Sequence, residues 1–499
     1  MPENSSIISS ELEIAKTPTQ PSVGQRMLRG VLIYGATNFG LKGMNFGLVV
    51  LFTRSLTPAD FGIVALAEII AAIVAAVSSL GLSAAMQPLY FRYISDRTTL
   101  QRCVSTLLRF GAVATLFFLF LSLLVGTFLA PHLRFQVAFF PYIATALCTM
   151  GALQLVDYRL VLYQIEEKPI SYSMLAVWCF VFTGLATVYR VILLRGGAMG
   201  LLGGKFIGAV LTLCLALWLA RRWIRSGWQE SFVREALQLS LPLVPHLLLA
   251  LGLVAADRLI LQRYRNTQEV GLYSLAYTVG MMMFLVTASL SQAWSPVFYR
   301  MASQGDAKRP LIGRVHSVLL LLLGAVAMIG STLAHPFVRG VLDSRYWPAA
   351  PLIPLVIGGY LFHAVFTFFQ MSALHARRSQ FVWVVSILAL AVNIALNFAW
   401  DPKWGMLGAA WATTVAYAIE GLAMYLYAQR VYALPVNPRR LALVTAMFCL
   451  LLVITQLSFP PVAQMLTVGA ACAMALLALW GMSRNDLTLL RKLLHPVAY

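Results

Sequence analysis

Residues 253–277, LVAADRLILQRYRNTQEVGLYSLAY, place Asp257 and Arg258 between two long apolar runs. The whole chain has 499 residues, is 60% hydrophobic and only 11% charged, and has a mean hydropathy of +0.79. A water-soluble protein of this size needs far more polar surface than this composition supplies. We therefore interpret the polar connector inside this stretch as the turn between two membrane-spanning helices.

Apolar runs of this kind recur along most of the chain. A bilayer-spanning helix needs about 20 mostly apolar residues, and continuous rather than alternating runs favour helices over a β-barrel. Dividing the chain at its charged, Pro and Gly breaks predicts fourteen spans. They cover residues 27–53, 61–87, 104–130, 135–164, 169–193, 197–221, 237–262, 268–297, 310–338, 347–375, 380–400, 405–430, 439–460 and 461–482.

The net charge of +19 raises the question of nucleic acid as a partner. With the N-terminus inside, most of the 37 Lys and Arg fall in cytoplasmic segments such as RRWIRSGWQESFVRE (221–235) and HARRSQ (375–380). This distribution is the positive-inside bias of membrane proteins, and basic loops beside a bilayer also attract anionic lipids. We expect a multi-pass protein of the bacterial inner membrane with both termini cytoplasmic, and no nucleic-acid partner.

The connector in the opening stretch has a counterpart near the N-terminus. Residues 60–63, Asp-Phe-Gly-Ile, align with residues 269–272, Glu-Val-Gly-Leu, at an offset of 209. A second match, of GLLGGKFIGAV from Gly200 with GMLGAAWATTV from Gly405, has an offset of 205. The two offsets predict a duplicated six-helix unit in one orientation, as in transporters that hold substrate between their halves. Chance similarity of short Gly-rich pieces is the alternative.

The repeat divides the chain into five parts. We predict a polar, flexible cytoplasmic tail, because the first residues lack the order of a secretory signal. Two lobes of six helices, a final helix pair and a second cytoplasmic tail follow. The parts are residues 1–25, 26–225, 226–432, 433–482 and 483–499. The predicted fold class is an all-α integral membrane protein of about 14 helices.

Charge inside hydrocarbon costs roughly 3 kcal/mol on insertion scales, so depth ranks the polar residues within the spans. Lys42 lies close to mid-depth in the first span, and Asn38, Lys42 and Asn45 share a face by their i, i+4, i+7 spacing. We interpret Lys42 as a cation that faces a watery cavity, where it could meet an anion. A Lys paired with a carboxylate in the bundle core is the alternative.

Several arginines lie nearer the ends of spans, where a long side chain can snorkel to the surface. Arg258 is close to the outer end of its span, and Arg54 occupies the similar outer turn of the first copy. Arg109 and Arg159 lie near cytoplasmic ends. Each of these residues is either an anchor or, for Arg54 and Arg258, a further cation for an anionic substrate.

Three acids lie inside predicted spans: Glu68, Asp257 and Glu420. Asp257 follows His246 by eleven residues, close to three helical turns, so the two share a side of the helix. Each acid could relay a proton or a coupling cation, H⁺ or Na⁺, or form half of a structural ion pair. Lys205, early in its span, is expected to be a pairing residue.

The sequence contains no familiar catalytic or metal motif. It has no DxD, HExxH, GxSxG or Walker-type loop, and its six cysteines form no CxxC or Cys/His cluster. We expect a protein that is not an enzyme, binds no cofactor and draws on H⁺ or Na⁺ coupling rather than directly on ATP. Asn393 and Asn397, four residues apart, are expected to hydrogen-bond between helices.

Four stretches carry motifs of a known family. LSLPLVPHLLLALGLVAADRLILQRYRNTQEVGLYSLAYTVG (239–280) has a Pro-rich helix start, an Asp-Arg and a VGLYS-A run, and AWSPVFYR (293–300) is similar to a W-P-x-x-Y/F element. NIALNFAWDPKWGMLGAAWATTVAY (393–417) resembles N-x-x-L-N followed by Y/W-G-x-x-G-A-A-x-A-T, and TRSLTPADFGIVALA (53–67) resembles L-x-P-x-x-Y/F-G. By these motifs the chain resembles the polysaccharide transport proteins, or O-antigen-type flippases, of the multidrug/oligosaccharidyl-lipid/polysaccharide (MOP) exporter superfamily.

The resemblance implies two six-helix lobes and a final pair around a central, often cationic cavity. It implies movement of a polyprenyl-pyrophosphate-linked oligosaccharide from the cytoplasmic to the outer leaflet, for cell-surface polysaccharide biosynthesis. The implied partners are this lipid, membrane lipids, and a polymerase and other polysaccharide-assembly proteins. Lys42, with Arg54 and Arg258, would meet the pyrophosphate. The family usually has Ile-Pro where this chain has Asp401-Pro402.

Two alternatives use the same scaffold. A MATE-like ion-coupled exporter of small cationic molecules would place acids rather than Lys42 in its pocket. An exporter of finished polysaccharide, or a flippase for a cell-wall precursor, is hardly distinguished by the sequence. A membrane glycosyltransferase is the remaining alternative, and the missing motifs argue against it.

Overall fold

The computed structural model describes residues 23–129, 132, 136–224, 227–376, 378 and 380–437, with four positions between 442 and 448. The predicted final helix pair and the second cytoplasmic tail therefore lie outside the described residues, apart from those four positions. Nearly all of the predicted first tail does too. Statements about the fold below concern the described part of the chain.

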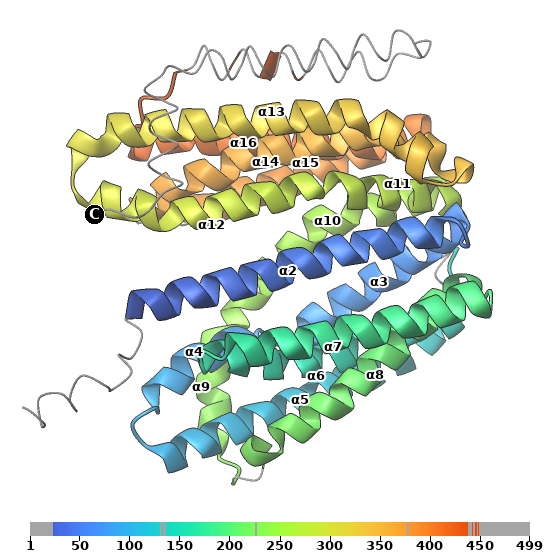
Figure 1. Ribbon diagram of the computed structural model, residues 1–499, viewed down its shortest axis with the longest axis vertical. Helices are drawn as coiled ribbons and strands as arrows, with labels where there is room; N and C mark the ends of the chain where they lie inside the picture. The colour runs from blue at the N-terminus through green and yellow to red at the C-terminus, as the bar shows by residue number, and fades with distance from the viewer. Residues whose placement is uncertain are drawn as a thin grey trace, which may run out of the picture.

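This part of the chain is helical, which confirms the predicted fold class (Figure 1). The α-helices are α2 (Val23–Thr53), α3 (Pro58–Ser78), α4 (Leu82–Arg92), α5 (Arg97–Leu129), α6 (Ala144–Ile165), α7 (Pro169–Val188), α8 (Gly197–Ile224), α9 (Glu230–Ser240), α10 (Val244–Tyr264), α11 (Thr267–Gly280), α12 (Met282–Ser303), α13 (Arg309–Val341), α14 (Leu352–His375), α15 (Gln380–Trp404) and α16 (Met406–Val431). Short π and 3₁₀ helices lie between them: η2 (Phe139–Ile143), η3 (Tyr189–Leu193), η4 (Leu241–Leu243), η5 (Asp306–Lys308) and η6 (Ser344–Ala349).

Nine helical stretches among the described residues are long and apolar enough to cross a membrane. The other predicted spans in this part of the chain, 27–53, 237–262 and 405–430, fall on α2, on α9 and α10, and on α16. The span 237–262 is not one helix as predicted: the chain passes through η4, which contains Pro242, because proline cannot donate the backbone hydrogen bond that a continuous helix needs.

Helices α2–α9 form one group and α10–α16 another, and Figure 1 shows them meeting where α3 and α11 pack together. The same helix pairs recur in both groups. Helix α8 packs on α6 and α7, as α16 packs on α14 and α15, and α2 packs on α7 as α10 packs on α15. We call the groups the N-lobe and the C-lobe. Their shared packing supports the duplication, while the residue boundaries predicted for the domains stay predictions.

Equivalent residues begin equivalent helices in the two lobes. Thr57 caps α3 by accepting a hydrogen bond from the Asp60 amide, and Asn266 caps α11 by accepting one from the Glu269 amide. Side-chain oxygens at such positions satisfy amides that a helix start leaves unpaired. Each acid also reaches a later helix of its own lobe. Asp60 accepts from the amide of Ala198 at 3.0 Å, and Glu269 accepts from that of Met406 at 3.1 Å.

The structure corrects the register of the second repeat match. Gly197 and Gly405, just before Ala198 and Met406, have left-handed φ values of +57° and +55°. A side chain at either position would be strained, and its Cβ would also meet the acid of its lobe. These two glycines are therefore equivalent at an offset of 208. The alignment of Gly200 with Gly405 was three residues out because several Gly-x-x-Gly spacings overlap there.

Candidate functional site

The two lobes touch backbone to backbone at one end, where α3 and α11 begin. A Cβ at Gly62 would lie 1.8 Å from the carbonyl oxygen of Thr267, and a Cβ at Gly271 would lie 1.7 Å from that of Pro58. These glycines are the pair matched at the offset of 209, so each repeat leaves room at its glycine for the backbone of the other repeat. Only glycine permits this approach. We call this end of the molecule, at which α2 ends and α3 and α11 begin, the closed end.

A glutamine of the N-lobe reaches across the closed end. Gln136 donates its Nε2 to the carbonyl oxygens of Gln262 and Arg265 in the C-lobe, at 3.1 and 2.7 Å. Both acceptors belong to the connection between α10 and α11 or to the last turn before it. The free carbonyls at the end of a helix are therefore held by a side chain of the opposite lobe.

An arginine of the C-lobe makes the mirrored contact. Arg345 donates its Nη2 to the carbonyl oxygens of Thr53 and Arg54 at the end of α2, each at 3.3 Å. Arg345 follows Gln136 by 209 residues, and Gln262 follows Thr53 by the same number. The closed end thus carries the same kind of contact twice. We call each contact a latch: the side chain of Gln136 or Arg345 in one lobe donates to two backbone carbonyls of the other lobe. The sequence match around Gly62 and Gly271 could have pointed to Gln136 and Arg345, since these two residues are also separated by 209 positions.

Neighbouring residues support the C-lobe latch. The Tyr346 hydroxyl donates to the carbonyl of Leu56 at 2.9 Å, and its ring packs edge-on against Phe61. Asp343 holds Arg345 through a 2.8 Å bond to its Nε, and this bond keeps the pKa of the Asp343 carboxyl below its ordinary value. Asp343 therefore stays ionised at neutral pH, and its support is lost only as the pH falls through that lowered pKa.

We expect Gln136→Ala and Arg345→Ala each to open the closed end in part. Each removes hydrogen bonds worth roughly 1 kcal/mol at this partly exposed site, about a fivefold change in population. The double variant should open it further by about the sum, because the latches share no partner. Spin-label distances across the closed end measure the effect. Arg378→Ala, at the opposite end of α14, is the matched control, and an unchanged double variant would contradict the assignment.

Helix α2 lies between the lobes with much of its surface uncovered. Lys42 and Asn45 are exposed, and among the described residues Lys42 has no ion-pair partner. The Asn38 side chain lies outside the described residues. Near the closed end Phe46 stacks on Phe337 of α13, with ring centroids 5.7 Å apart. Lys42 thus stands where a cation could meet a substrate between the lobes, and its role stays a prediction.

The glycines of α2 do not make close contact with another described helix. A Cβ at Gly43 or Gly47 would meet nothing within 4 Å, and the same holds for Gly35 and Gly40. Their small size leaves a slim helix surface facing open space. A spacing of small residues predicts packing only where a partner helix covers that face.

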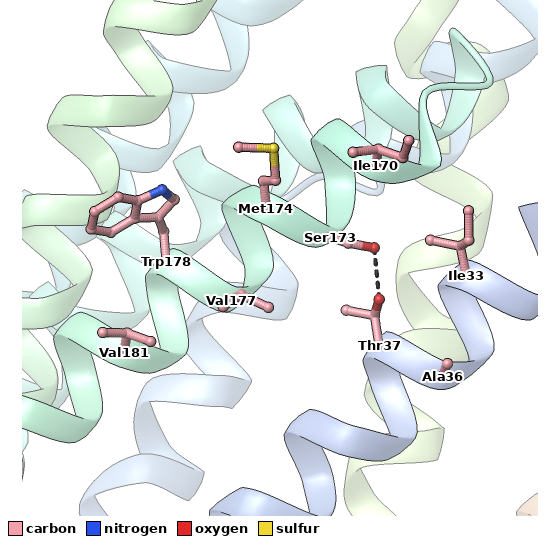
Figure 2. A pocket seen from close by; sticks show the side chains of 9 residues that line it. All are labelled: Ile33, Ala36, Thr37, Ile170, Ser173, Met174, Val177, Trp178 and Val181. Atoms are coloured by element: carbon pink, nitrogen blue, oxygen red, sulfur yellow. Dashed lines mark hydrogen bonds between the residues drawn. The ribbon is translucent and has the colours of Figure 1, made fainter.

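A shallow apolar pocket of about 660 Å³ lies between α2 and α7 (Figure 2). Figure 2 shows Thr37 of α2 and Ser173 of α7 pointing toward each other across it, and their hydroxyls lie 2.6 Å apart. Its remaining lining is apolar: Ile33, Ala36, Ile170, Met174, Val177, Trp178 and Val181. The single polar contact ties α2 to the N-lobe. The pocket itself offers no charge for a polar ligand.

Arg258 does not lie where the sequence placed it. We predicted either a surface anchor or a cation for an anionic substrate, close to the outer end of the span, but its side chain is buried in the C-lobe. Its Nε donates to Ser274 at 3.1 Å, its Nη1 lies 3.4 Å from Asp257, and the guanidinium sits over the ring of Tyr277. Packing by α11, which residue depth along α10 cannot reveal, encloses it. Arg258 is the counter-charge of Asp257.

Asp257 is the centre of a buried polar cluster. Its side chain has no exposed surface, and it accepts from the Tyr273 hydroxyl at 2.5 Å and from the backbone amide of Arg258 at 2.7 Å. Thr413 of α16 lies 3.4 Å from the same carboxylate and 3.2 Å from the amide nitrogen of Asn393. The expected helix-to-helix role of Asn393 is confirmed by this bond.

The cluster continues to a carboxylate that sequence analysis missed. Asn397 donates to the Asn393 side chain at 3.1 Å, and Asp401 follows one turn later on α15. Asp401 is fully buried, and in the part of the chain that the structure describes neither of its side-chain oxygens has a hydrogen-bond partner, nor does Oδ1 of Asn397. The i, i+4, i+8 spacing from Asn393 could have indicated it. Arg265 donates only to the backbone carbonyls of Asp401 and Pro402 and is matched by Glu269.

Within α10–α16 this cluster, which we call the Asp401 cluster, contains more acids than bases. It holds the carboxyl groups of Asp257 and Asp401 and one guanidinium, that of Arg258. Asn393, Asn397 and Thr413 add neutral oxygens. Buried carboxylates without partners are costly unless a cation or proton joins them. Among the described residues, no group of three or more His, Cys, Asp or Glu is arranged to hold a metal ion.

The remaining predicted residues have separate places. Glu68 pairs with Lys205 at 2.5 Å, as expected for Lys205. Glu420 is buried and meets His363, which sequence analysis did not single out. Arg54 is exposed at the closed end, where its carbonyl, not its guanidinium, is used by the latch. The His246 side chain lies outside the described residues.

Comparison of folds finds similarity to solved structures of membrane transporters. A structure of the lipid II flippase MurJ in an inward closed conformation matches with a TM-score of 0.68 and 13% identity, covering 89% of this chain and 98% of that one. An inward-facing MATE family transporter of the MOP superfamily matches at 0.58 and 12%, covering 80% and 98%. The Vibrio cholerae MATE transporter VcmN in its bent form matches at 0.52 and 14%, covering 81% and 98%. At such identities the likeness concerns the fold.

The sequence itself gives the family. No curated protein matches the chain. A family profile described as "polysaccharide biosynthesis protein" matches residues 27–302, more than half of the chain, including most of α2, the starts of α3 and α11 and the Asp257–Arg258 pair. With this match, on a multi-pass helical fold shared with MOP exporters, the chain belongs to the polysaccharide biosynthesis protein family.

Proposed function

We propose that the chain is a flippase that carries a polyprenyl-pyrophosphate-linked oligosaccharide from the cytoplasmic to the outer leaflet of the bacterial inner membrane. Both termini are cytoplasmic, and the closed end faces outward. The observation that carries the proposal is Lys42, a cation without an ion-pair partner among the described residues, exposed on a helix between two repeat-related lobes. The protein acts as a transporter and not as an enzyme.

The chemistry of such a lipid fits this arrangement. A glycan headgroup is too polar to cross hydrocarbon, and its pyrophosphate needs a counter-charge on the way. Lys42 supplies a mobile ammonium close to mid-depth, where charge attraction is strong, and the exposed Asn45 amide can hydrogen-bond sugar hydroxyls. Breaking the latches at the closed end and re-forming contacts at the other end exposes Lys42 to each side in turn.

The Asp401 cluster provides the coupling. One monovalent cation, Na⁺ or H⁺, neutralises its surplus carboxylate, and its ligands come from α10, α15 and α16. Helix α10 contributes to the Asp401 cluster and leads directly into the α10–α11 connection. Gln136 donates to one carbonyl in the last turn of α10 and to one in that connection, so binding of a cation in the cluster affects the contacts at the closed end. Binding in one conformation more tightly than in the other shifts the equilibrium between them.

Reconstitution tests the function. Purified protein in liposomes should translocate a fluorescent polyprenyl-pyrophosphate oligosaccharide, and Lys42→Ala should lower the rate at least tenfold, since the pyrophosphate loses its cation. Lys308→Ala removes an exposed lysine at the far connection between α12 and α13 and serves as the matched control. Full translocation by Lys42→Ala at equal protein abundance would remove Lys42 from the mechanism.

A MATE-like exporter of small molecules is the second candidate, favoured by the fold match and by the buried acids of the C-lobe. Lys42 argues against a cationic cargo. A drug-sensitivity panel on a deletion strain separates the two, because a flippase leaves drug resistance unchanged while cell-surface polysaccharide is lost. Export of finished polymer or of a cell-wall precursor would show in the same strain as loss of that product. We also propose that the protein works together with a polymerase and other polysaccharide-assembly proteins.

A further inference from the structure

A second ionisable pair lies in the C-lobe, apart from the Asp401 cluster. His363 of α14 and Glu420 of α16 meet through Nδ1 and Oε2 at 2.8 Å, and the Ser386 hydroxyl of α15 lies 3.4 Å from the other carboxylate oxygen. The Glu420 side chain is 1% exposed and that of His363 is 20% exposed. The two residues lie near the middle of their helices, where an unpaired charge costs most.

The surroundings leave His363 as the one counter-charge. Its ring stacks on Phe366 at 5.4 Å and lies 5.0 Å from Tyr417 and 6.1 Å from Phe284 of α12. In the described chain, no Lys or Arg forms an ion pair with Glu420, and the titratable groups that face the pair are the tyrosines Tyr417 and, behind it, Tyr360. The net charge of the pair is therefore set by its protons.

The repeat makes this pair stand out. The positions 209 and 208 residues earlier, on α6 and α8 of the N-lobe, hold Gln154 and Thr212, neither of which changes charge. The N-lobe has its own intramembrane pair, Glu68 with Lys205, in which a lysine supplies a lasting positive charge. The fold thus does not require a His–Glu pair, and the C-lobe has two ionisable side chains where the N-lobe has Gln154 and Thr212.

We propose that His363 and Glu420 form a proton-binding site in the middle of the C-lobe, distinct from the Asp401 cluster. With one proton the pair is neutral, whether the proton sits on the carboxyl or on the imidazole. Release of this proton to water, on the more exposed side of His363, leaves Glu420 as a buried carboxylate. Such a charge is tolerated only in a conformation that admits water, so protonation stabilises the conformation described here.

The site is placed to act together with the Asp401 cluster. Thr413 and Glu420 lie seven residues apart on α16, two turns along one face. A row of tyrosine rings fills the distance: Tyr417 to Tyr360 at 5.8 Å, Tyr360 to Tyr277 at 5.7 Å, and Tyr277 to Tyr273 at 5.9 Å. A shift of α16 on proton release therefore reaches both sites. The inference deepens the proposed function and rests on it for the membrane setting.

Proton uptake by the purified full-length chain in nanodiscs tests the site. When the pH is lowered from alkaline to neutral, Glu420→Gln should take up about one proton fewer per chain than the unaltered protein. Glu68→Gln is the matched control: it removes a carboxylate held by Lys205 and should leave uptake in this range unchanged. Equal uptake by Glu420→Gln and the unaltered protein would overturn the proposal.

A conformational measurement adds a result that would not change if His363 and Glu420 had only a structural role. The spin-label distance across the closed end should depend on pH in the unaltered protein and lose that dependence in both Glu420→Gln and His363→Gln. His363→Gln keeps a hydrogen-bond donor, so it serves if Glu420→Gln folds poorly; pH dependence retained in the folded variant contradicts the site. Lys42→Ala should keep normal proton uptake, which separates failure of this site from failure of the flippase proposal.

Discussion

Gly271→Ala is expected to separate the lobes at the closed end and to stop transport. The new Cβ would lie 1.7 Å from the carbonyl oxygen of Pro58 and 2.7 Å from its carbon, and these are backbone atoms that cannot rotate away. Overpacking of this kind costs about 1–3 kcal/mol, which lowers the closed population by roughly 5- to 150-fold. Spin-label distances between the exposed residues Ser55 and Trp347 measure the separation.

Gly62→Ala should give the same result, because its Cβ would meet the carbonyl oxygen of Thr267 at 1.8 Å. Gly43→Ala and Gly47→Ala are the matched controls, since a Cβ there meets nothing within 4 Å. Thermal unfolding of each variant shows whether the lobes themselves remain folded. A Gly271→Ala protein that keeps the unaltered distance and transport rate would show that α3 and α11 do not cross here.

Asp257→Asn and Asp401→Asn should change stability in opposite directions. Asp257 is held by Tyr273 and by the buried Arg258, so its neutralisation strands a guanidinium and costs about 3–5 kcal/mol. Among the described residues neither side-chain oxygen of Asp401 has a hydrogen-bond partner, so replacement by Asn removes the cost of ionising a buried acid. In buffers without Na⁺, Asp401→Asn should unfold at a higher temperature than the unaltered protein.

The response to cations completes this test. A cation that binds the folded protein raises its unfolding temperature with concentration, so the unaltered protein should gain stability as Na⁺ replaces choline, or as the pH falls if the ion is H⁺. Asp401→Asn should lose this gain. The exposed Asp306→Asn controls for general salt effects. If Asp401→Asn destabilises the protein without Na⁺, or responds to cations as before, the cluster is not the coupling site.

The spans were predictable because the membrane leaves few alternatives. In the described chain the predicted spans are mostly helical, although 61–87, 237–262 and 268–297 each run over two α-helices, and the capping sequence from Thr57 to Asp60 marks the start of α3. The break at Pro242 was missed because the three residues of η4, Leu-Pro-Leu, are apolar and do not interrupt the hydropathy run. Lys205 was placed correctly as a pairing residue, since a charge at that depth needs a partner.

The site was only partly predictable, because a residue's depth along its own helix does not reveal which neighbour covers it. Arg258 was expected at a surface and is enclosed by α11. Asp401 lies just past the predicted span 380–400, yet α15 continues past it to Trp404, and the side chain is buried. His363 carries no motif, and its partner lies 57 residues away.

The sequence alone determined that this chain spans a membrane many times as two repeated helical units. The length of an apolar run and the offset of 209 between matching residues can both be read along the chain, without knowledge of which segments pack together. Only the tertiary structure decided that the repeats meet at Gly62 and Gly271, that paired latches hold that end, and that Asp401 lies buried without a partner. Those facts depend on which backbones approach within a few ångströms, and packing between distant segments sets that distance.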